Sequence, residues 1–592
     1  VGGHRHLLAY LVRRLLENGA NSSFVSVVGD TSVPVERLLV RPAASLGPDQ
    51  PARHPKIPLP VDLYRPSRAN SRGLEFGHTD QLAALTRGVS ALALPVPDAS
   101  PLVDGEAREG ASRPVVSPAD GTTVVGTVHE ATPVIADAAM AAAASGFSGW
   151  SRQPAAERAR LLDRIADLYE SRQNDLIALL ASEGGRTLAD GLAEVREAVD
   201  FCRYYAAESR KVFADKTMPG PTGEENRYRL RGRGVFVCIS PWNFPLAIFT
   251  GQIAAALAAG NSVVAKPAEQ TPLIGALAVR LMHEAGIPGT ALQFVPGDGA
   301  IGARLVAHKN VAGVAFTGST ETAWKINRTL AAKNGPIVPL IAETGGINAM
   351  IVDATALPEQ VSDDVVMSAF RSAGQRCSAL RLLLVQEDVA DRMVEMICGA
   401  ARELKLGDPR DPATDIGPVI DTDARDRLAA HVEHMKTEQK VTFAGNTPSG
   451  TLGGGTWFAP HVIELNSPGD LREEVFGPIL HVARWKSGSL DKVIEAIAAS
   501  GYGLTLGVHS RIDDVHRRVA DQLAVGNIYV NRNMIGAVVG TQPFGGSGLS
   551  GTGPKAGGPD YLARFAQEQV VTINTAAAGG NASLIAISDD PA

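Results

Sequence analysis

The spacing of apolar residues changes several times along the chain and becomes regular from about residue 118. Apolar residues at helical spacing predict long helices over about residues 131–146 and 155–182. Short apolar runs then alternate with helix-like segments, which predicts a buried parallel sheet with crossover helices. These runs cover residues 235–239, 262–265, 292–295, 311–316, 337–341, 349–352 and 382–385. The pattern therefore predicts an α/β fold with a doubly wound sheet.

The first part of the chain is patterned differently. Residues 6–18 carry leucines at helical spacing and end at Gly19, which predicts a short helix. Six prolines between residues 41 and 65 predict an extended connector. Residues 66–115 are poorly patterned, and we expect them to wrap on the surface of the regular region that begins near residue 118. The chain begins with Val and no signal peptide is recognisable, so we expect a piece of a longer protein.

Composition limits the classes of function. The 592 residues carry a net charge of −7, which gives no general attraction to nucleic acid or to an anionic membrane. The four cysteines, Cys202, Cys238, Cys377 and Cys398, form no CxxC pair, so neither a disulfide framework nor a thiolate zinc site is expected. Gly, Pro or charge interrupts every apolar stretch before the roughly 20 residues that a membrane span requires. A reducing, cytoplasmic location without a metal fits best.

Two residues suggest oxidation of an aldehyde. Cys377 lies in the sequence AGQRCS, and Glu343 begins the sequence ETGG. A thiolate can attack an aldehyde carbonyl, the adduct can lose hydride, and a carboxylate base can then activate water against the thioester. Each residue alone has a simpler interpretation, because a free cysteine is usually a small buried hydrophobe and a lone glutamate is usually solvated.

An asparagine between two prolines adds to this picture. Asn243 lies in the sequence SPWNFP, directly after the predicted strand 235–239. Its amide could donate to the oxyanion that forms when a thiolate adds to a carbonyl. The alternative is an asparagine that only stabilises a turn.

Several segments after predicted strands suit a dinucleotide. The GxGxxG pattern of residues 297–302 is weak, because no acidic residue lies at the expected position about 20 residues later. Thr317-Gly318-Ser319 is a better phosphate site, since a strand ends and a helix begins there. Lys266 and Glu269 could hydrogen-bond ribose hydroxyls, although Lys266 could also be a surface lysine. Glu474 and Phe476, in the sequence EVFGP, could hold a nicotinamide ribose and ring.

Taken in order, these motifs resemble the aldehyde dehydrogenase superfamily over about residues 118–575. The resemblance implies a Rossmann-type cofactor domain, an α/β catalytic domain, a small oligomerisation hairpin near residues 215–231 that pairs with a strand near 570–574, and a homodimer. It implies that Cys377 is the nucleophile, Glu343 the general base, and Asn243 with the Cys377 N–H the oxyanion hole. The expected cofactor is NAD, held by Ser240, Pro241, Trp242, Lys266, Glu269, Gly299, Thr317, Gly318, Ser319, Glu474 and Phe476.

A narrower resemblance comes from both ends of the chain. The sequence LAYLVRRLLEN at residues 8–18 resembles the last helix of the proline dehydrogenase barrel in bifunctional proline utilization A enzymes, and residues 54–60 and 544–558 resemble their connector and substrate-anchoring loop. The resemblance implies oxidation of L-glutamate γ-semialdehyde, from 1-pyrroline-5-carboxylate, and a natural fusion to a flavin-dependent proline dehydrogenase domain. The expected substrate-binding residues are Ser378, Gly557, Gly558, Phe244 and Glu183.

These interpretations divide the chain into five parts. The expected parts are a barrel remnant (1–40), a linker that wraps the surface (41–117), an NAD-binding domain (118–343), a catalytic domain (344–530) and a substrate-anchor loop with an oligomerisation strand (531–592). Two other functions remain open: another semialdehyde or CoA-acylating aldehyde dehydrogenase, and a catalytically silent scaffold or dimerisation module. NAD over NADP is what the family resemblance implies; Glu269 near the ribose would disfavour a 2′-phosphate without excluding it.

Overall fold

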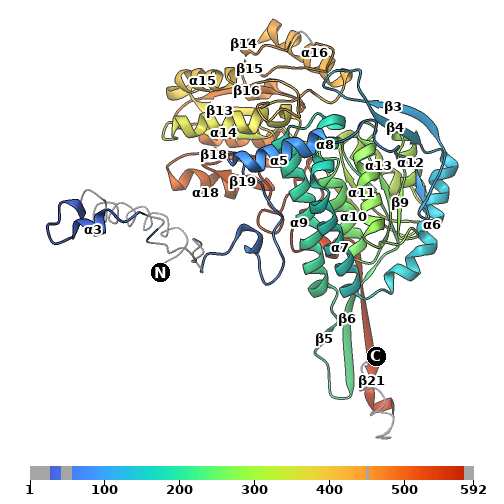
Figure 1. Cartoon of the computed structure of the whole chain (residues 1–592). Coiled ribbons are helices and arrows are strands. Elements are labelled where there is room, and N and C mark those ends of the chain that lie inside the picture. The colour runs from blue at the N-terminus through green and yellow to red at the C-terminus, as the bar shows by residue number, and fades with distance from the viewer. Residues whose placement is uncertain (1–26, 42–43, 45–55, 449–452, 579–592) are drawn as a thin grey trace. The chain divides into compact units, whose positions relative to one another are not determined.

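The computed structural model describes residues 27–41, 44, 56–448 and 453–578 (Figure 1). The chain divides into two compact units, residues 1–63 and 64–592. In the first unit, the described residues form helix α3 (Val35–Leu38) and the 3-10 turn η1 (Pro60–Asp62). The helix predicted over residues 6–18 lies outside the described residues, as does part of the predicted connector.

The second unit contains a seven-stranded sheet with the order β11-β10-β7-β8-β9-β1-β2. Strands β7 to β11 run parallel, while β1 and β2 extend the edge antiparallel. The chain order reverses beside β7, which has β8 on one side and β10 on the other. In such a sheet, ligands bind at the carboxyl ends of the strands at this switch point. The strands are β1 (Leu102–Val103), β2 (Glu106–Ala107), β7 (Val235–Ile239), β8 (Ser262–Lys266), β9 (Leu292–Phe294), β10 (Val311–Thr317) and β11 (Leu340–Glu343).

Helices cover both faces of this sheet (Figure 1). Alternate residues of β7 explain why: Phe236 and Cys238 join one apolar cluster, while Val235 and Val237 join another on the opposite face. The parallel, doubly wound sheet predicted from the sequence is confirmed. The first face packs against α7 (Ala155–Ser171), α8 (Gln173–Gly184), α9 (Leu188–Val212), α10 (Ala247–Ala258) and α11 (Pro272–Glu284), and the second against α6 (Pro133–Ser151), α12 (Gly299–Ala307) and α13 (Thr320–Ala331).

Three predictions about local structure were wrong. The single helix expected over residues 155–182 is two helices, because the chain leaves helical geometry at Arg172, whose side chain bonds Asp175 in the first turn of α8. The strand expected from residue 337 begins only at Leu340, since Pro336 and Pro339 cannot donate to a ladder. Ile337 is fully exposed there.

The third wrong prediction is that the segment 66–115 only wraps the surface. It contains α5 (Thr79–Ser90), which buries Leu85 and Val89, and strand β1, which joins the sheet beside β9. β3 (Ala111–Val116) then pairs with β4 (Val124–Glu130). The proposed boundary at residue 118 therefore cuts through elements that pack together.

A second seven-stranded sheet lies within residues 344–530, with the order β14-β15-β16-β13-β12-β18-β19. All its pairs are parallel except β14 with β15 at one edge. Its strands are β12 (Ala349–Val352), β13 (Leu382–Gln386), β14 (Lys440–Ala444), β15 (His461–Glu464), β16 (Ile479–Trp485), β18 (Thr505–His509) and β19 (Asn527–Val530). Its helices are α14 (Pro358–Phe370), α15 (Glu387–Arg402), α16 (Thr422–Glu438), α17 (Leu490–Ala499) and α18 (Asp513–Gln522), with 3-10 turns η2 (Arg371–Gly374) and η4 (Pro468–Asp470).

A three-stranded sheet projects away from these layers (Figure 1). It consists of β5 (Lys216–Met218), β6 (Glu224–Gly232) and β21 (Ala566–Asn574), with β6 in the middle. The predicted pairing of this hairpin with a C-terminal strand is confirmed. The short elements β17 (Tyr502–Gly503), β20 (Ser547–Gly548), α19 (Tyr561–Arg564) and η5 (Thr575–Ala578) complete the described chain, in which no helix has the length and apolar character to cross a membrane.

Candidate active site

The switch point brings two predicted segments together. Ser240 follows β7, and Thr317 ends β10, the neighbouring strand. Gln252 of α10 connects them: it accepts a hydrogen bond from the Ser240 hydroxyl at 3.0 Å and donates to the Thr317 hydroxyl at 3.1 Å. The segments 240–243 and 317–319 therefore lie at one edge of the sheet, as the sequence predicted.

A cavity of about 350 Å³ opens beside this edge and contains Cys377. Its wall comes from the ends of β10 and β11 in the first sheet, from helix α9, from the turn that carries Cys377 and from the C-terminal part of the chain. Residues predicted from the sequence that line it are Cys377, Glu343, Ser378, Phe244 and Thr317. Residues that the sequence analysis missed include Glu197, Asp200, Arg376, Gly536, Ala537, Val539 and Phe544.

The backbone before Cys377 has an unusual conformation. Ser372, Ala373 and Gly374 have φ values of 58°, 54° and 64°, so two residues with side chains occupy the left-handed region. Such residues cost about 1–2 kcal/mol each and persist only where their surroundings fix them. At Gly374 a side chain would also collide with the carbonyl of Gly477. The turn that presents Cys377 is therefore held in place from outside.

Two groups hold this turn. On one side Asp190 of α9 binds Arg371 at 2.6 Å and Arg376 at 3.2 Å, and accepts from the Ser372 hydroxyl at 2.8 Å. Burial would raise the pKa of Asp190, but these arginines and Arg186 hold it well below its usual value. The Asp190 carboxylate therefore stays ionised and fixes the turn to α9.

On the other side lies Arg381, which begins the approach to β13 and is fully buried. Its guanidinium donates to the carbonyls of Gly374 at 2.7 Å and Arg376 at 2.9 Å. It also donates to the Gly477 carbonyl at 3.1 Å and lies 3.4 Å from the Glu474 carboxylate. One cation thus joins the turn before Cys377 to the segment 474–477.

Asn243 lies beside the Cys377 turn. Its side-chain amide donates to the Gln375 carbonyl at 3.1 Å, and Asn243 is 5% exposed. Among the described residues, no hydrogen bond uses the backbone N–H of Cys377. This amide and this N–H are therefore available as donors to an oxygen atom bound at the sulfur.

The resting thiol is protonated. Burial, together with the carboxylates of Glu474 and Glu343, raises the pKa of Cys377 to about 12, while Arg376 opposes the shift. The nucleophile therefore has to lose its proton to a base when a substrate binds.

Glu343 ends β11 at the same cavity. Burial raises its pKa to about 8, against the effects of the Gly546 N–H and of Lys555. The Gly546 N–H donates to one carboxylate oxygen at 2.9 Å, while the other oxygen is buried and, in the described part of the chain, unpaired. A carboxylate with such a pKa and a free oxygen can take up a proton near neutral pH.

The lining of the cavity also offers groups that fit an amino acid. Ser378 contributes a hydroxyl. Gly536 and Ala537 contribute backbone N–H groups that donate to no described residue. Glu197 of α9 adds a carboxylate, and burial with the nearby Glu194 raises its pKa to about 7. The hydrogen-bond donors suit the α-carboxylate of an amino acid, and the Glu197 carboxylate suits its α-ammonium group.

Three residues predicted to contact the substrate, Glu183, Gly557 and Gly558, are not among those that line this cavity. Glu183 accepts from the N–H groups of Leu273 and Ile274 at 2.7 and 2.9 Å, and therefore caps α11 away from the cavity lining. The N–H groups of Gly557 and Gly558 already donate to the Tyr205 hydroxyl and the Lys555 carbonyl. The donors that face the cavity belong instead to Gly536 and Ala537.

These residues left weak signals in the sequence. Glu197 is half-buried on α9, beside the buried Ala198 and one turn before the buried Phe201, and a carboxylate next to an apolar stripe indicates a site. Gly536 and Ala537 lie in a stretch without periodicity, so only the tertiary fold places them. Phe244 lines the cavity, and the guanidinium groups of Arg186 and Arg376 lie 4.8 and 5.0 Å from its ring centre.

The groups expected to hold a dinucleotide fit that role. Lys266, at the carboxyl end of β8, is buried, which lowers its pKa, and Glu269 is the nearest carboxylate acting on it. Ser319 caps α13 by accepting from the Thr322 N–H, so that the helix N-terminus points its N–H groups at the sheet edge.

Gly299, another predicted cofactor residue, begins α12. Asp298 caps this helix by accepting from the N–H groups of Ala300 and Ile301 at 2.9 and 3.1 Å. A Cβ added at Gly299 would meet no described atom within 4 Å. The protein's own packing therefore does not require glycine there, and the space above the first turn of α12 is open to a ligand.

The segment around Glu474 reaches the same edge. Trp242 meets Phe476 edge-on at 5.5 Å between ring centres. The Glu474 carboxylate packs against Gly345 so closely that any side chain there would collide with it. Burial raises the pKa of Glu474, and Arg381 opposes the shift. The ring and carboxylate expected to hold nicotinamide thus lie next to the ETGG segment.

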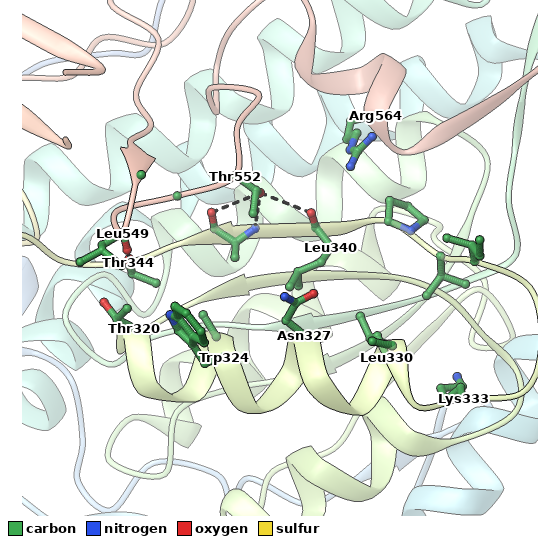
Figure 2. A pocket seen from close by; sticks show the side chains of 18 of the residues that line it. Thr320, Trp324, Asn327, Leu330, Lys333, Leu340, Thr344, Leu549, Thr552 and Arg564 are labelled. Carbon is green, nitrogen blue, oxygen red and sulfur yellow. Dashed lines mark hydrogen bonds between the residues drawn. The ribbon is translucent and has the colours of Figure 1, made fainter. Parts of the chain in front are cut away.

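A second hollow, of about 570 Å³, lies between α13 and β11. Figure 2 shows Trp324, Asn327 and Leu330 on α13 facing Leu340 of β11. The Thr552 hydroxyl donates to the Leu340 carbonyl at 3.3 Å and accepts from the Ala342 N–H at 2.9 Å. Cys377 does not line this hollow.

The fold and the site define an enzyme class in which a cysteine and a glutamate act beside a dinucleotide site. Residues 105–571 match the model of the Aldehyde dehydrogenase family, and the chain belongs to that family. Residues 1–27 match the Proline dehydrogenase family.

Individual relatives are similar over most of the chain. The bifunctional protein PutA of Escherichia coli (strain K12) is 50% identical over 579 residues, which cover 95% of this chain and 43% of the relative. The chain thus spans less than half the length of that protein. The 1-pyrroline-5-carboxylate dehydrogenase of Geobacillus kaustophilus (strain HTA426) is 36% identical over 86% of this chain and 99% of its own length.

Solved structures agree. A crystal structure of a bifunctional proline utilization A protein has a TM-score of 0.83 at 63% identity, covering 98% of this chain and 56% of that one. A 1-pyrroline-5-carboxylate dehydrogenase from Thermus with bound NAD has a TM-score of 0.82 at 34% identity, covering 85% and 99%.

Proposed function

We propose that this chain oxidises L-glutamate γ-semialdehyde, the open form of 1-pyrroline-5-carboxylate, to L-glutamate with NAD as the oxidant. The observation that carries the proposal is one cavity whose lining combines Cys377 with the Ser378 hydroxyl, Glu197 and the segment that holds the free N–H groups of Gly536 and Ala537. The relatives named as 1-pyrroline-5-carboxylate dehydrogenases, and the NAD-bound one among them, support it.

The residues then have these roles. A base removes the Cys377 proton, the sulfur bonds to the aldehyde carbon, and the Asn243 amide and Cys377 N–H stabilise the negative oxygen. NAD held by the residues at this sheet edge would supply the acceptor for the hydride that leaves this carbon. A thioester to Cys377 remains.

Hydrolysis completes the cycle. Glu343 takes a proton from water, the resulting hydroxide adds to the thioester carbon, and the carbon–sulfur bond breaks. The cysteine leaves as thiolate and the product leaves as a carboxylate. Each turnover consumes one aldehyde, one water and one NAD, and it yields L-glutamate, NADH and protons.

We also propose a homodimer, with the sheet β5–β6–β21 as the main contact. β21 and β5 are the edge strands of this projecting sheet, and edge strands are templates for pairing. Val570 is 61% exposed on it, and Trp324 is 51% exposed beside the hollow of Figure 2. Sedimentation should give twice the 62.0 kDa chain mass, and Val570→Arg should shift the protein toward monomer. A wild-type monomer would end this proposal.

Two further proposals concern context. The match of residues 1–27 to the Proline dehydrogenase family supports fusion to a flavin-dependent proline dehydrogenase that supplies the aldehyde. All four cysteines are free thiols, which supports a reducing, cytoplasmic location.

The deciding experiment follows NADH absorbance with 1-pyrroline-5-carboxylate, acetaldehyde and succinate semialdehyde. We expect 1-pyrroline-5-carboxylate to give the highest kcat/KM, and Cys377→Ala to abolish NADH formation while calorimetry still detects NAD binding. A preference for acetaldehyde, or activity without Cys377, would overturn the assignment. Strict dependence on CoA would indicate the acylating type.

A further inference from the structure

Residues 64–73 pack behind the wall of the substrate cavity through a few buried side chains. They lie outside both family matches, which cover residues 1–27 and 105–571. Arg68 is 8% exposed and Ser71 is 1% exposed, although the sequence around them has no regular pattern. This segment, which lies in neither family match, therefore buries Arg68, Asn70 and Ser71 while its other residues are half-buried or exposed.

Arg68 contacts two residues that line the cavity. Its guanidinium donates to the Asp200 carboxylate at 3.0 Å and to the Val539 carbonyl at 2.9 Å. Ser71 donates two further hydrogen bonds to the Asp200 carboxylate, from its N–H at 3.0 Å and from its hydroxyl at 2.7 Å. Arg68 thus neutralises a buried carboxylate and fixes the backbone of the 536–539 segment.

The same segment makes a second contact with this wall. The Arg68 guanidinium stacks on the Tyr64 ring at 3.9 Å, and the Tyr64 hydroxyl lies 3.0 Å from the Thr541 hydroxyl. The Gly540 N–H, between these two points, donates to the Gly557 carbonyl at 2.9 Å. The stretch that carries the free N–H groups of Gly536 and Ala537 is therefore anchored at Val539, Gly540 and Thr541.

We infer that Arg68 is a positioning residue that sets the specificity of this enzyme for an α-amino acid aldehyde. It acts on the cavity wall and, among the described contacts, touches neither Cys377 nor the cofactor edge. Without it, the Asp200 carboxylate would lose its cation beside the place where the substrate carboxylate binds, and the Val539 backbone would lose its tether. An uncompensated buried charge and a displaced wall both weaken binding of a charged substrate. The inference rests on the proposed function.

The test compares Arg68→Gln and Arg68→Lys with Arg72→Gln. Arg72 is a matched control, because it lies in the same segment but its side chain is 76% exposed and meets Glu170 at 3.6 Å, away from the cavity. For Arg68→Gln we expect KM for 1-pyrroline-5-carboxylate to rise on the order of tenfold. KM for NAD, and kcat/KM for propanal, which has neither an ammonium nor a carboxylate, should stay within about twofold. Arg68→Lys keeps the charge without the planar fork and should have an intermediate KM.

Several results would overturn the inference. These are an unchanged KM in Arg68→Gln, an equal loss with propanal, or the same change in Arg72→Gln. If Arg68→Gln does not fold, Arg68→Lys and Tyr64→Phe decide, and wild-type KM values in both would end the inference. A wild-type enzyme that oxidises propanal but not 1-pyrroline-5-carboxylate would instead contradict the proposed function.

L-Glutamate gives a readout that needs no turnover, because it carries the same ammonium and carboxylate as the substrate. We expect it to raise the Tm of the wild type and of Arg72→Gln, and to raise that of Arg68→Gln much less. An equal rise in all three would overturn the inference.

Discussion

The side-chain amide of Asn243 donates a hydrogen bond of 3.1 Å to the backbone carbonyl of Gln375, two residues before Cys377. Asn243 follows β7 of the first sheet, while Gln375 precedes β13 of the second. The proposed nucleophile and its proposed oxyanion donor therefore lie on segments of different sheets, and neither sheet alone contains the site. Substitutions that disturb this junction should affect chemistry before they affect the binding of either substrate.

Asn243→Ala tests the oxyanion role directly. Loss of one such donor lowers kcat by roughly 100- to 1000-fold in enzymes where it has been measured. We expect a decrease of that size, with KM for NAD nearly unchanged, in steady-state NADH assays. A decrease of less than about threefold would mean that the amide only stabilises the turn.

Glu343→Gln separates the two halves of the reaction. Without a base for water, the thioester should accumulate, so rapid mixing should show a burst of one NADH per site followed by very slow turnover. Mass spectrometry of the quenched protein should find the acyl group on Cys377. Undiminished steady turnover would remove Glu343 from the base role.

The pH dependence follows from the same carboxylate. Burial raises the pKa of Glu343 to about 8, so below that pH most molecules carry a protonated carboxyl that cannot accept a proton from water. If hydrolysis limits turnover, kcat should rise with pH, about tenfold per unit well below pH 8, and level off above it. A flat profile between about pH 6 and 9, in an enzyme that shows a burst, would contradict this assignment.

The sequence predicted the position of the proposed reaction and cofactor residues better than that of the proposed substrate-binding residues. Ser240, Asn243, Thr317 and Ser319 follow apolar runs directly, and the carboxyl ends of parallel strands share one edge, so their clustering could be predicted. Gly536 and Ala537 could not be found this way, because no periodic element carries them and their position depends on contacts with Arg68 and Tyr529.

Glu183, in contrast, was assigned to the site although it does not line the cavity. The family resemblance placed a carboxylate near the substrate ammonium and assigned that role to Glu183. Its position on α8 instead aims it at the N-terminus of α11, where it satisfies two N–H groups. Only the packing of α8 against α11 distinguishes the two possibilities.

Substitution of the two glutamates should separate specificity from stability. Glu197→Gln removes a charge beside the bound ammonium and should raise KM for 1-pyrroline-5-carboxylate by on the order of tenfold, with little change in Tm. Glu183→Ala leaves two buried N–H groups without partners and should cost about 2–3 kcal/mol of unfolding free energy, with KM unchanged. The comparison combines steady-state kinetics with denaturant unfolding, and reversed phenotypes would restore Glu183 as the substrate contact.

Arg381 should control the nucleophile and the cofactor together. Its fork joins the carbonyls of Gly374 and Arg376 to the Glu474 carboxylate, and a lysine keeps the charge but cannot reach these groups at once. In Arg381→Lys we expect single-turnover NADH formation to slow at least about tenfold and the Kd for NAD to rise severalfold. Arg402→Lys is the control, because Arg402 lies over the Phe443 ring as Arg381 lies over the Phe476 ring, but only Arg381 donates to the turn before Cys377. Stopped-flow absorbance and calorimetry measure the two effects. If only the Tm fell while rate and Kd kept their wild-type values, Arg381 would be a core residue that leaves the geometry at Cys377 unaffected.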